Sequence, residues 1–243
     1  MASCFAQSPL KIAKTFAREK GVDVCVMDCS PGMLAGDHYA FSWHLEENAQ
    51  VAVSTQGFCR VHPSRERACL LQQKFELKSG AWLDFFPEPM VLYRDAALRT
   101  ESQIEMSATA TLLLSEIVCA GRIARGEAFG FHCLQNRVHV RCDGKLVYAN
   151  QTGLRPADFQ AQRVGAWGDF THQGTLSIFS ARAGEELQKA LQTVLDQEAH
   201  TPVWGGVSQL ERFGLTVALL GRRACDLQLL MQQLRGEVRG HLR

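Results

Sequence analysis

The sequence predicts a mainly β protein, an irregular β-helix or solenoid-like stack of strands with two α-helices in its C-terminal region. Three observations predict this fold class. Short apolar or alternating runs recur through the first two-thirds of the chain, and a strand–turn–strand pattern repeats about every 30 residues. Helical periodicity is confined to the last third of the chain.

The strand-like runs come first along the chain. Each combines β-branched, aromatic or alternating apolar residues, and turn residues such as Ser79-Gly80 separate one run from the next. Asp143-Gly144 stands between two such runs and predicts a two-residue β-hairpin. The expected strands are 22–27, 40–45, 50–54, 68–77, 81–86, 98–106, 111–118, 131–141 and 145–148.

The repeat lies at three of the turns. In each, an apolar residue ends a strand, a three-residue turn and an alanine follow, and an apolar residue then begins the next strand. The alanines are Ala49, Ala81 and Ala110, which lie 32 and 29 residues apart. Such a period favours a stack of β coils. Three unrelated hairpins in a sandwich are the alternative.

The last third predicts a helix, two strands and a second helix. Apolar residues of 184–199 and of 222–238 fall on one helical face each, and the strands 203–210 and 215–220 flank Phe213-Gly214. Because no linker rich in proline, glycine or serine interrupts the chain, we expect a single domain over 1–243. Its β-rich part would span 8–180, and its helix–strand–strand–helix part 182–238.

Composition excludes several classes of partner. The 243 residues carry a net charge of +1, which gives no strong pull toward nucleic acid or anionic lipid, and no apolar run approaches the roughly 18 residues of a membrane span. The chain has nine cysteines, an odd number, and no C-x-x-C pair. That cysteine usage predicts reduced thiols in a cytoplasmic protein, and the charge and the lack of a membrane span predict no nucleic-acid or membrane partners. The N-terminal residues also lack the apolar core of a signal peptide.

A carboxylate lies inside the most apolar strand. Side chains alternate along 111–118, so Glu116 shares a face with Leu112 and Leu114, and both faces are mostly apolar. A charge buried there costs several kcal/mol unless it is paired, metal-bound or protonated. Glu116 could act with Glu127 as a carboxylate pair for acid–base work or cation passage. Alternatively, Glu116 pairs with Arg122 and Glu127 lies at the surface.

A second candidate is the glycine-bracketed turn that ends at Asp37-His38. An adjacent carboxylate and imidazole can bind a divalent cation. Alternatively, Asp37 accepts hydrogen bonds from backbone N–H groups of the loop, and His38 points to solvent. The sequence contains neither a phosphate-binding loop with Lys-Ser or Lys-Thr nor a Gly-x-Ser-x-Gly elbow, so it offers no convincing nucleophile–base set.

Taken together, several segments resemble the urease accessory proteins of the UreD type, called UreH in some species. The likeness covers about residues 8–238. It is strongest from Asp28 to Asp143 and depends on the order of many short motifs. These are Ser8-Pro-Leu-Lys11, Ser30-Pro-Gly-Met-Leu-Ala-Gly-Asp37, Val53-Ser-Thr-Gln56, Arg60-Val-His62, Gly80-Ala-Trp-Leu-Asp-Phe-Phe-Pro87, Glu116-Ile-Val-Cys-Ala-Gly-Arg122, Gly126-Glu-Ala-Phe129, Asn136-Arg137 and Gly174-Thr-Leu176.

The resemblance implies a scaffold that is not an enzyme. Such proteins bind a UreF-type partner, which recruits a UreG-type GTPase, and dock on the urease apoprotein to help deliver nickel, thought to move through an internal tunnel. Carried over, Asp37, Glu116 and Glu127 would lie along or near the nickel path, with His38 as a neighbour. No tightly bound cofactor is implied, and Ni²⁺ would bind transiently. Acidic oxygen ligands suit such a path, because they attract a cation and release it, whereas thiolates would trap it.

Two other functions stay open from the residues alone. One is a β-rich protein-interaction scaffold without a metal role. The other is a carboxylate- or metal-dependent hydrolase that uses Asp37, Glu116 and Glu127.

Overall fold

The computed structural model describes residues 3–158, 161, 163, 166–197 and 203–242. Its strands and helices follow one another along the chain in this order: β1 (Leu10–Arg18), β2 (Gly21–Asp28), β3 (His38–Leu45), β4 (Gln50–Thr55), β5 (Cys59–Val61), β6 (Cys69–Leu77), β7 (Trp82–Phe86), β8 (Met90–Leu92), β9 (Ala97–Met106), β10 (Thr111–Cys119), the 3-10 helix η1 (Ile123–Arg125), β11 (Cys133–Cys142), β12 (Lys145–Leu154), β13 (His172–Phe179), α1 (Glu185–Gln197), β14 (Val203–Gln209), β15 (Gly214–Gly221) and α2 (Ala224–Leu242).

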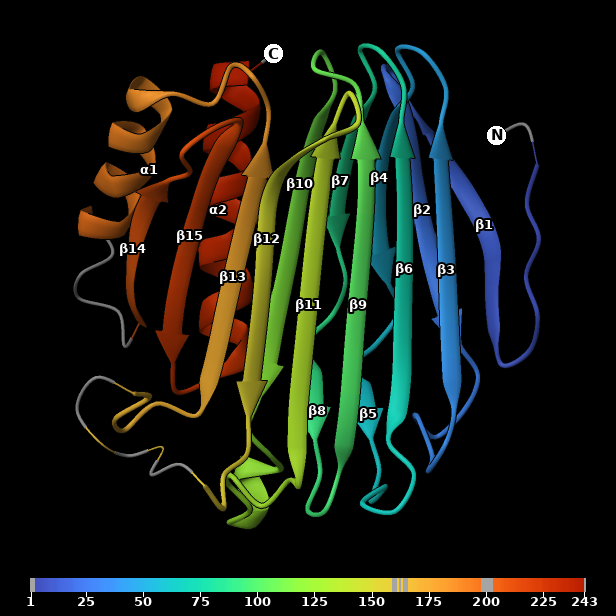
Figure 1. The fold of residues 1–243 in the computed structure, drawn as a ribbon, viewed down its shortest axis with the longest axis vertical. Helices are drawn as coiled ribbons and strands as arrows, with labels where there is room; N and C mark the ends of the chain where they lie inside the picture. Colours follow the sequence, from blue (N-terminus) through green and yellow to red (C-terminus); the bar gives the residue numbers. More distant parts are fainter. Residues whose placement is uncertain (1–2, 159–160, 162, 164–165, 198–202, 243) are drawn as a thin grey trace.

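Two sheets face each other, and the chain passes back and forth between them (Figure 1). The five-stranded sheet has the order β12-β11-β9-β6-β3. The ten-stranded sheet runs β1-β2-β4-β7-β10-β13-β15-β14, with β5 and β8 joined beside β10. The predicted mainly β class with two helices near the C-terminus is confirmed.

Stacked coils form the centre of the molecule. In the five-stranded sheet β3, β6, β9 and β11 pair in parallel, and in the other sheet β4, β7 and β10 do the same. The three repeated alanines lie at the corners where the chain changes sheets. There the Trp82 N–H donates to the Ala49 carbonyl and the Thr111 N–H to the Ala81 carbonyl, each at 2.8 Å. The repeat therefore marks equivalent corners of successive coils, as the sequence predicts.

The stack ends at the predicted Asp-Gly hairpin. Asp143 and Gly144 have φ values of 48° and 76°, a left-handed conformation that suits a tight hairpin turn. The turn sends β12 back antiparallel along β11, so the chain does not begin another coil at this corner.

The C-terminal part extends the ten-stranded sheet and covers it. Strands β13, β15 and β14 pair antiparallel beyond β10, while α1 and α2 lie on the sheet face turned away from the five-stranded sheet (Figure 1). Helix, two strands and helix follow in the predicted order. The part of the predicted helix 184–199 that lies beyond Gln197 falls outside the described residues.

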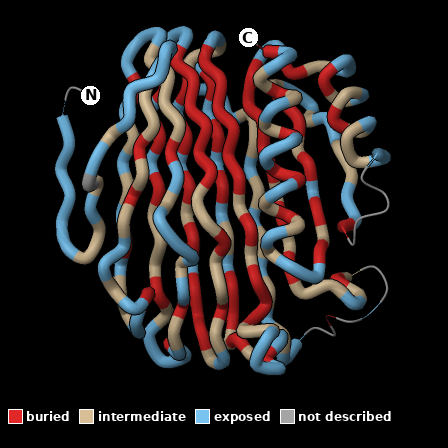
Figure 2. Tube along the Cα trace, turned by 180° about the vertical axis from the view of Figure 1, so that it is seen from behind, coloured by how far each residue is buried: buried red, intermediate tan, exposed pale blue. Residues whose placement is uncertain are grey.

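Strand β10 is buried on both faces, as predicted. Leu112 and Leu114 belong to the core between the two sheets, and Leu113 and Ile117 to the core beneath the helices. Figure 2 shows the central strands buried along most of their length, whereas the N-terminal edge of the sheet is largely exposed. Neither described helix is long and apolar enough to cross a membrane.

Four strands were not expected from the sequence: β1, β5, β8 and β13. β5 and β8 have three residues each, too few to show a period. β13 has Gly174 as its third residue, and glycine weakens a strand and gives no apolar signal. There a Cβ would lie 2.9 Å from the Met231 side chain, so the glycine lets α2 pack closely on the sheet.

Candidate functional site

The ten-stranded sheet has a break beside β10. Strand β10 pairs with β7 as far as Leu114 and with β8 only from Val118 onward. Between them the segment Pro87-Glu88-Pro89 leaves the sheet, which is expected because proline has no N–H to donate to a neighbouring strand. A cavity of about 400 Å³ occupies this break.

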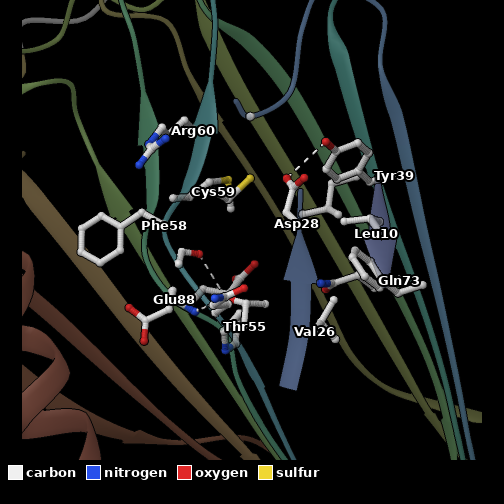
Figure 3. Close-up of a pocket in the computed structure, with 18 of the residues that line it drawn as sticks. Leu10, Val26, Asp28, Tyr39, Thr55, Phe58, Cys59, Arg60, Gln73 and Glu88 are labelled. Atoms are coloured by element: carbon white, nitrogen blue, oxygen red, sulfur yellow. Dashed lines mark hydrogen bonds between the residues drawn. The ribbon is translucent and has the colours of Figure 1, made fainter. Parts of the chain in front are cut away.

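The cavity runs along the edge of β10 where neither β7 nor β8 pairs with it. It is lined there by the successive residues Ser115, Glu116 and Ile117. Phe58, which also lines the cavity, is 42% exposed (Figure 3). Much of the cavity wall is apolar, from residues of both sheets: Val26, Phe41, Trp43, Leu71, Phe85, Met90 and Ile117.

Three carboxylates line the cavity, and Asp28 is the first. At the end of β2, Asp28 accepts a hydrogen bond from the Ser30 N–H at 2.8 Å and another from the Tyr39 hydroxyl at 3.2 Å. Burial, with the nearby Asp28 charge, raises the pKa of Tyr39 to about 12. Tyr39 therefore stays a neutral donor, and the charge of Asp28 is not compensated by it.

Glu88 is the second cavity carboxylate, and the extended segment between β7 and β8 carries it. Its backbone N–H donates to the Thr55 hydroxyl at 2.8 Å. Its carboxylate accepts from the side-chain amide of Gln228, on α2, also at 2.8 Å. In Figure 3 the Glu88 carboxylate points away from Asp28, with Thr55 next to Glu88 and Tyr39 next to Asp28.

Glu116 is the third, and it comes from the middle of β10. Its carboxylate accepts from the Asn136 amide at 3.0 Å, and the Asn136 carbonyl oxygen accepts from the Thr100 hydroxyl at 2.7 Å. This chain of contacts links β10 to β11 and β9 across the space between the sheets. Burial raises the pKa of Glu116, and the hydrogen bond from Asn136 opposes that rise without cancelling it.

All three cavity carboxylates thus have neutral hydrogen-bond donors. Among the described residues, no ion pair joins Asp28, Glu88 or Glu116 to a lysine or arginine. Hydrogen bonds from amides and hydroxyls orient a carboxylate, but they leave its charge in place. The cavity therefore holds several acidic groups that can attract a cation.

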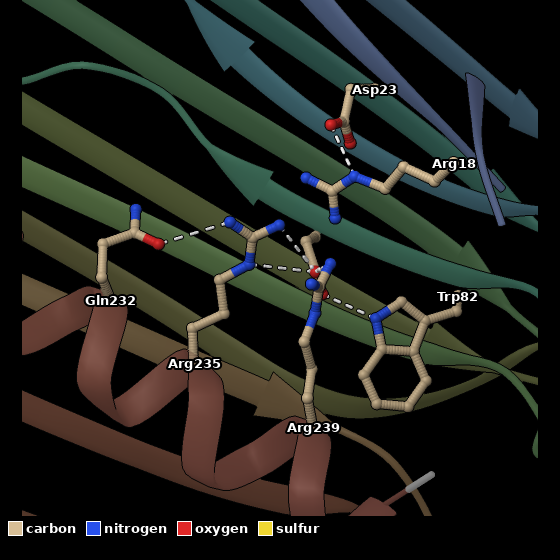
Figure 4. A network of polar contacts seen from close by, with 7 residues as sticks. Arg18, Asp23, Trp82, Gln232, Arg235 and Arg239 are labelled. Atoms are coloured by element: carbon tan, nitrogen blue, oxygen red, sulfur yellow. Dashed lines mark hydrogen bonds and ion pairs between the residues drawn. The ribbon is translucent and has the colours of Figure 1, made fainter. Parts of the chain in front are cut away.

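Asp84 shows the opposite arrangement on the same sheet. It is fully buried on β7, and it accepts from Arg235 at 3.0 Å, from Arg239, and from the Trp82 indole at 2.6 Å. Both arginines reach from α2 toward the sheet (Figure 4). Asp84 is compensated by two cations, and it fastens α2 to the sheet.

Glu127 is also compensated. The Arg122 guanidinium donates to it through Nη2 at 2.5 Å and Nε at 3.0 Å, and the Arg94 N–H donates at 2.6 Å. Burial alone would raise the pKa of Glu127, but these contacts outweigh it and the pKa is lowered. The alternative of a Glu116–Arg122 pair with Glu127 at the surface is therefore wrong. Arg122 pairs with Glu127, which is 6% exposed.

Asp37 and His38 lie in the loop that leads into β3. The Asp37 carboxylate accepts from the Leu34 N–H at 2.8 Å, so it stabilises the turn. His38 is exposed, and its Nε2 lies 2.7 Å from the side-chain oxygen of Gln72. Of the four residues singled out from the sequence, the structure places only Glu116 on the cavity wall; Asp37, His38 and Glu127 do not line it.

Sequence reasoning missed Asp28 and Glu88. A glutamate between two prolines was the available signal for Glu88, since the flanking residues exclude it from a regular strand. For Asp28 the chain offers only its place before the Ser30-Pro31-Gly32 turn. Nothing local says that either residue faces the same space as Glu116.

A resident metal centre is not evident in the part of the chain that the structure describes. No group of three or more His, Cys, Asp or Glu side chains there could hold a metal ion. Cys59 lines the cavity, but burial, together with the charge of Asp28, raises its pKa to about 12. At neutral pH it presents a thiol rather than a thiolate, which is the stronger ligand for soft metals.

Comparison with known proteins adds one consistent result. The sequence model described as "UreD urease accessory protein" matches residues 1–243. The chain is 28% identical over 230 residues to the urease accessory protein UreD of Acetivibrio thermocellus, covering 94% of this chain and 87% of the relative. It is 29% identical to UreD of Actinobacillus pleuropneumoniae serotype 5b, covering 95% and 88%. UreH of Helicobacter hepaticus is 27% identical over 175 residues, covering 72% and 69%.

Proposed function

Because the chain belongs to the UreD family of urease accessory proteins and so has a role in urease maturation, we propose that it is a nickel-delivery scaffold. In this role it acts without catalysing a reaction, and Ni²⁺ is its cargo. The cavity at the break in the ten-stranded sheet forms part of the nickel route.

The observation that carries this proposal is the state of the cavity carboxylates. Asp28, Glu88 and Glu116 line one solvent-accessible space, and each is held by neutral donors. A route for a divalent cation needs oxygen ligands that attract the ion but do not hold it in a closed shell. Uncompensated carboxylates spaced along a largely apolar wall meet that need.

Within this proposal the carboxylates have separate tasks. Glu88 and Asp28 would attract the cation near solvent, and Glu116 would receive it between the sheets. The raised pKa of Glu116 means that an arriving cation competes with a proton for this carboxylate. Asp37, His38 and Glu127 do not line the cavity. Their place near the nickel route stays a prediction from the family resemblance.

We further propose the partners that the family resemblance implies. The protein would bind a UreF-type protein, which recruits a UreG-type GTPase, and the assembly would dock on the urease apoprotein in the cytoplasm. Residues 1–243 would act as one domain. Co-purification of the chain with each partner tests this part of the proposal.

The nickel route is tested by Glu116→Gln, which removes the charge and keeps the shape. Urease is produced together with its accessory proteins, and its nickel content and activity are measured, with thermal unfolding of the variant as a check on folding. We expect a folded variant that loads much less nickel. Glu105→Gln is the control, because Glu105 is an exposed carboxylate paired with Arg141 on the five-stranded sheet.

Normal nickel content with Glu116→Gln would exclude the proposed route through this carboxylate. If urease then still assembled only in the presence of the protein, an interaction scaffold without a metal role would be the better description.

A further inference from the structure

The two helices cover only part of the outer face of the ten-stranded sheet. Helix α2 packs on β10, β13 and β15, and α1 packs on β14. Among the described residues, the apolar core beneath the helices takes strand side chains from β7, β10, β13, β14 and β15, but none from β1, β2 or β4. Figure 2 shows these three strands beside α2 with no helix in front of them.

Strand pairing decides which side chains project from this uncovered half. Asp84 of β7 contacts α2, and the register aligns it with Ala52 of β4 and through it with Asp23 of β2. Asp23 in turn pairs with Phe16 of β1, and Lys14 lies over the Phe16 ring, 5.4 Å from its centre. Because side chains alternate along a strand, the uncovered half, which we call the open face, comprises Lys11, Lys14, Phe16, Arg18, Asp23, Cys25, Met27, Gln50, Ala52 and Ser54.

The floor of the open face is made of short side chains. Cys25 and Ala52 are half-buried and Ser54 is exposed, whereas Phe16 at the β1 side is large, apolar and 51% exposed. The large apolar residues that fill the core beneath the helices have no counterpart here. A segment that packed on this floor could therefore approach the sheet closely and contact Phe16 from the side.

The rim of the open face is basic on the β1 side. Lys11 and Lys14 are exposed, and neither forms an ion pair with a carboxylate in the part of the chain that the structure describes. Arg18 pairs with Asp23 at 2.5 Å and keeps 40% of its side chain exposed. This strand therefore presents three cations to the open face, and a single carboxylate on the face answers them.

The rim is basic on the α2 side as well. Arg235 and Arg239 share one carboxylate, Asp84, and Figure 4 shows Arg18 reaching toward Arg235 from the opposite side. Burial lowers the pKa of Arg235, and the charges of Arg239 and Arg18 lower it further, so that Asp84 does not restore the ordinary value. The cations along both rims thus outnumber the carboxylates Asp23 and Asp84, and the open face attracts negative charge.

The open face has the width of one helix. Packed helices lie about 8–10 Å apart and neighbouring strands about 4.8 Å apart, so a helix beside α2 would lie two strands from β10, over β4. A flat membrane fits less well, because α2, about 10 Å thick, rises along one side and would keep the surface away from the floor.

We propose that the open face is the docking site for an acidic amphipathic helix of a protein partner. The apolar stripe of that helix would cover Phe16 and the short side chains of β2 and β4, and its carboxylates would meet Lys14 and Arg18 on one side and Arg235 on the other. A floor that is partly polar suits a partner that binds and leaves. The inference adds a surface and a partner chemistry to the proposed assembly and does not depend on the nickel route.

The test measures binding of the complete chain to the proposed UreF-type, UreG-type and urease partners. The double variant Lys11→Glu/Lys14→Glu reverses the two unpaired charges of the β1 rim. We expect it to bind the partner that carries the acidic helix at least about tenfold more weakly at low salt, and the deficit should shrink at high salt.

The matched control is Lys74→Glu/Lys145→Glu, which reverses two exposed lysines of the five-stranded sheet. It makes the same change in net charge away from the open face, so it should bind like the wild type. Both double variants should unfold at the wild-type temperature, because the four lysine side chains are exposed.

Cys25 supplies a second readout without any substitution. Its half-buried thiol belongs to the open face, so its alkylation by iodoacetamide should slow in the assembly. Cys225, exposed at the start of α2, is the reference thiol and should keep its rate.

Unchanged binding of Lys11→Glu/Lys14→Glu to partners that the wild type binds would overturn the inference and leave the partner proposal intact. Equal weakening by the control would also overturn it, because the attraction would then be unspecific. Protection of Cys25 in a dimer of the protein alone would make a second copy the occupant, and protection only by phosphatidylserine vesicles would make it a membrane. A wild-type chain that binds none of the partners would refute the partner proposal and this inference together.

Discussion

Asp84 and Glu116 lie on neighbouring strands of the same sheet, but the groups that contact their carboxylates differ in charge. Asp84 is fully buried against two arginines of α2, whereas Glu116 receives one hydrogen bond from an amide and faces a cavity. The charge of the first carboxylate is compensated by the two guanidinium groups. The second has no cationic partner among the described residues and lines the cavity. The charge of the partner group, more than burial, therefore distinguishes a carboxylate that anchors a helix from one that could bind a cation.

The largest effect should come from removing the anchor. Asp84→Ala leaves Arg235 and Arg239 without this acceptor, and their side chains are only 15% and 23% exposed. Breaking a buried ion pair from one side costs about 3–5 kcal/mol, so we expect a loss of that order in urea unfolding. Glu46→Ala is the control, because its pair with Lys78 is largely exposed and should contribute far less to stability.

A loss for Asp84→Ala no larger than that of the control would contradict its role as an anchor. It would also remove the contrast between a compensated and an uncompensated carboxylate on the same sheet.

Glu127→Gln should have a smaller effect, about 2 kcal/mol at neutral pH, because a neutral amide replaces a carboxylate that binds Arg122. The direction of the pKa shift decides how the stabilising contribution of Glu127 changes with pH. The pKa of Glu127 in the folded protein is below its ordinary value of 4.5. Its stabilising contribution is therefore present above pH 4.5 and is lost as the pH falls through the lowered pKa.

The measurement for Glu127 is urea unfolding of the wild type and the variant from pH 3 upward. The difference in unfolding free energy should shrink toward zero in acid. A difference that stays constant over this range would mean that the Glu127 charge does not contribute, and that its hydrogen-bonding shape alone is needed.

Much of the fold could be predicted from the sequence, because the signals for it are local. The corner alanines and Asp143-Gly144 reflect backbone geometry that a few neighbouring residues decide, and the helix at 222–238 follows from a period of 3.6 residues. β13 depends on packing: Gly174 is there because Met231, more than fifty residues later, comes close. Such a reason is not visible in the strand itself.

The site was less accessible to prediction, because it is defined by pairing between distant segments. Glu116 could be identified, since a charge inside an apolar strand is anomalous wherever it occurs. The partner of Arg122 could not be chosen from spacing, because Glu116 and Glu127 lie six and five residues away from it. Asp28 and Glu88 became candidates only when the break in the sheet placed them beside Glu116.

Glu116→Gln should show the smallest change in stability, and one of opposite sign to Glu127→Gln. The pKa of Glu116 in the folded protein is above its ordinary value of 4.5, chiefly because burial disfavours the charged form. The stability that this group contributes is complete below pH 4.5 and is lost as the pH rises through the raised pKa. Glutamine does not ionise, so the variant should gain on the wild type as the pH rises.

Below pH 4.5 the two proteins should have unfolding free energies within about 1 kcal/mol, because glutamine and protonated glutamate both accept from Asn136. Above that pH the curves should separate in favour of the variant. If they stay parallel, or if the wild type becomes the more stable, an unrecognised cation compensates Glu116 as arginines compensate Asp84. The expected result would instead show that the Glu116 carboxylate destabilises the folded protein. Binding of the transported cation would then explain why a glutamate occupies this strand.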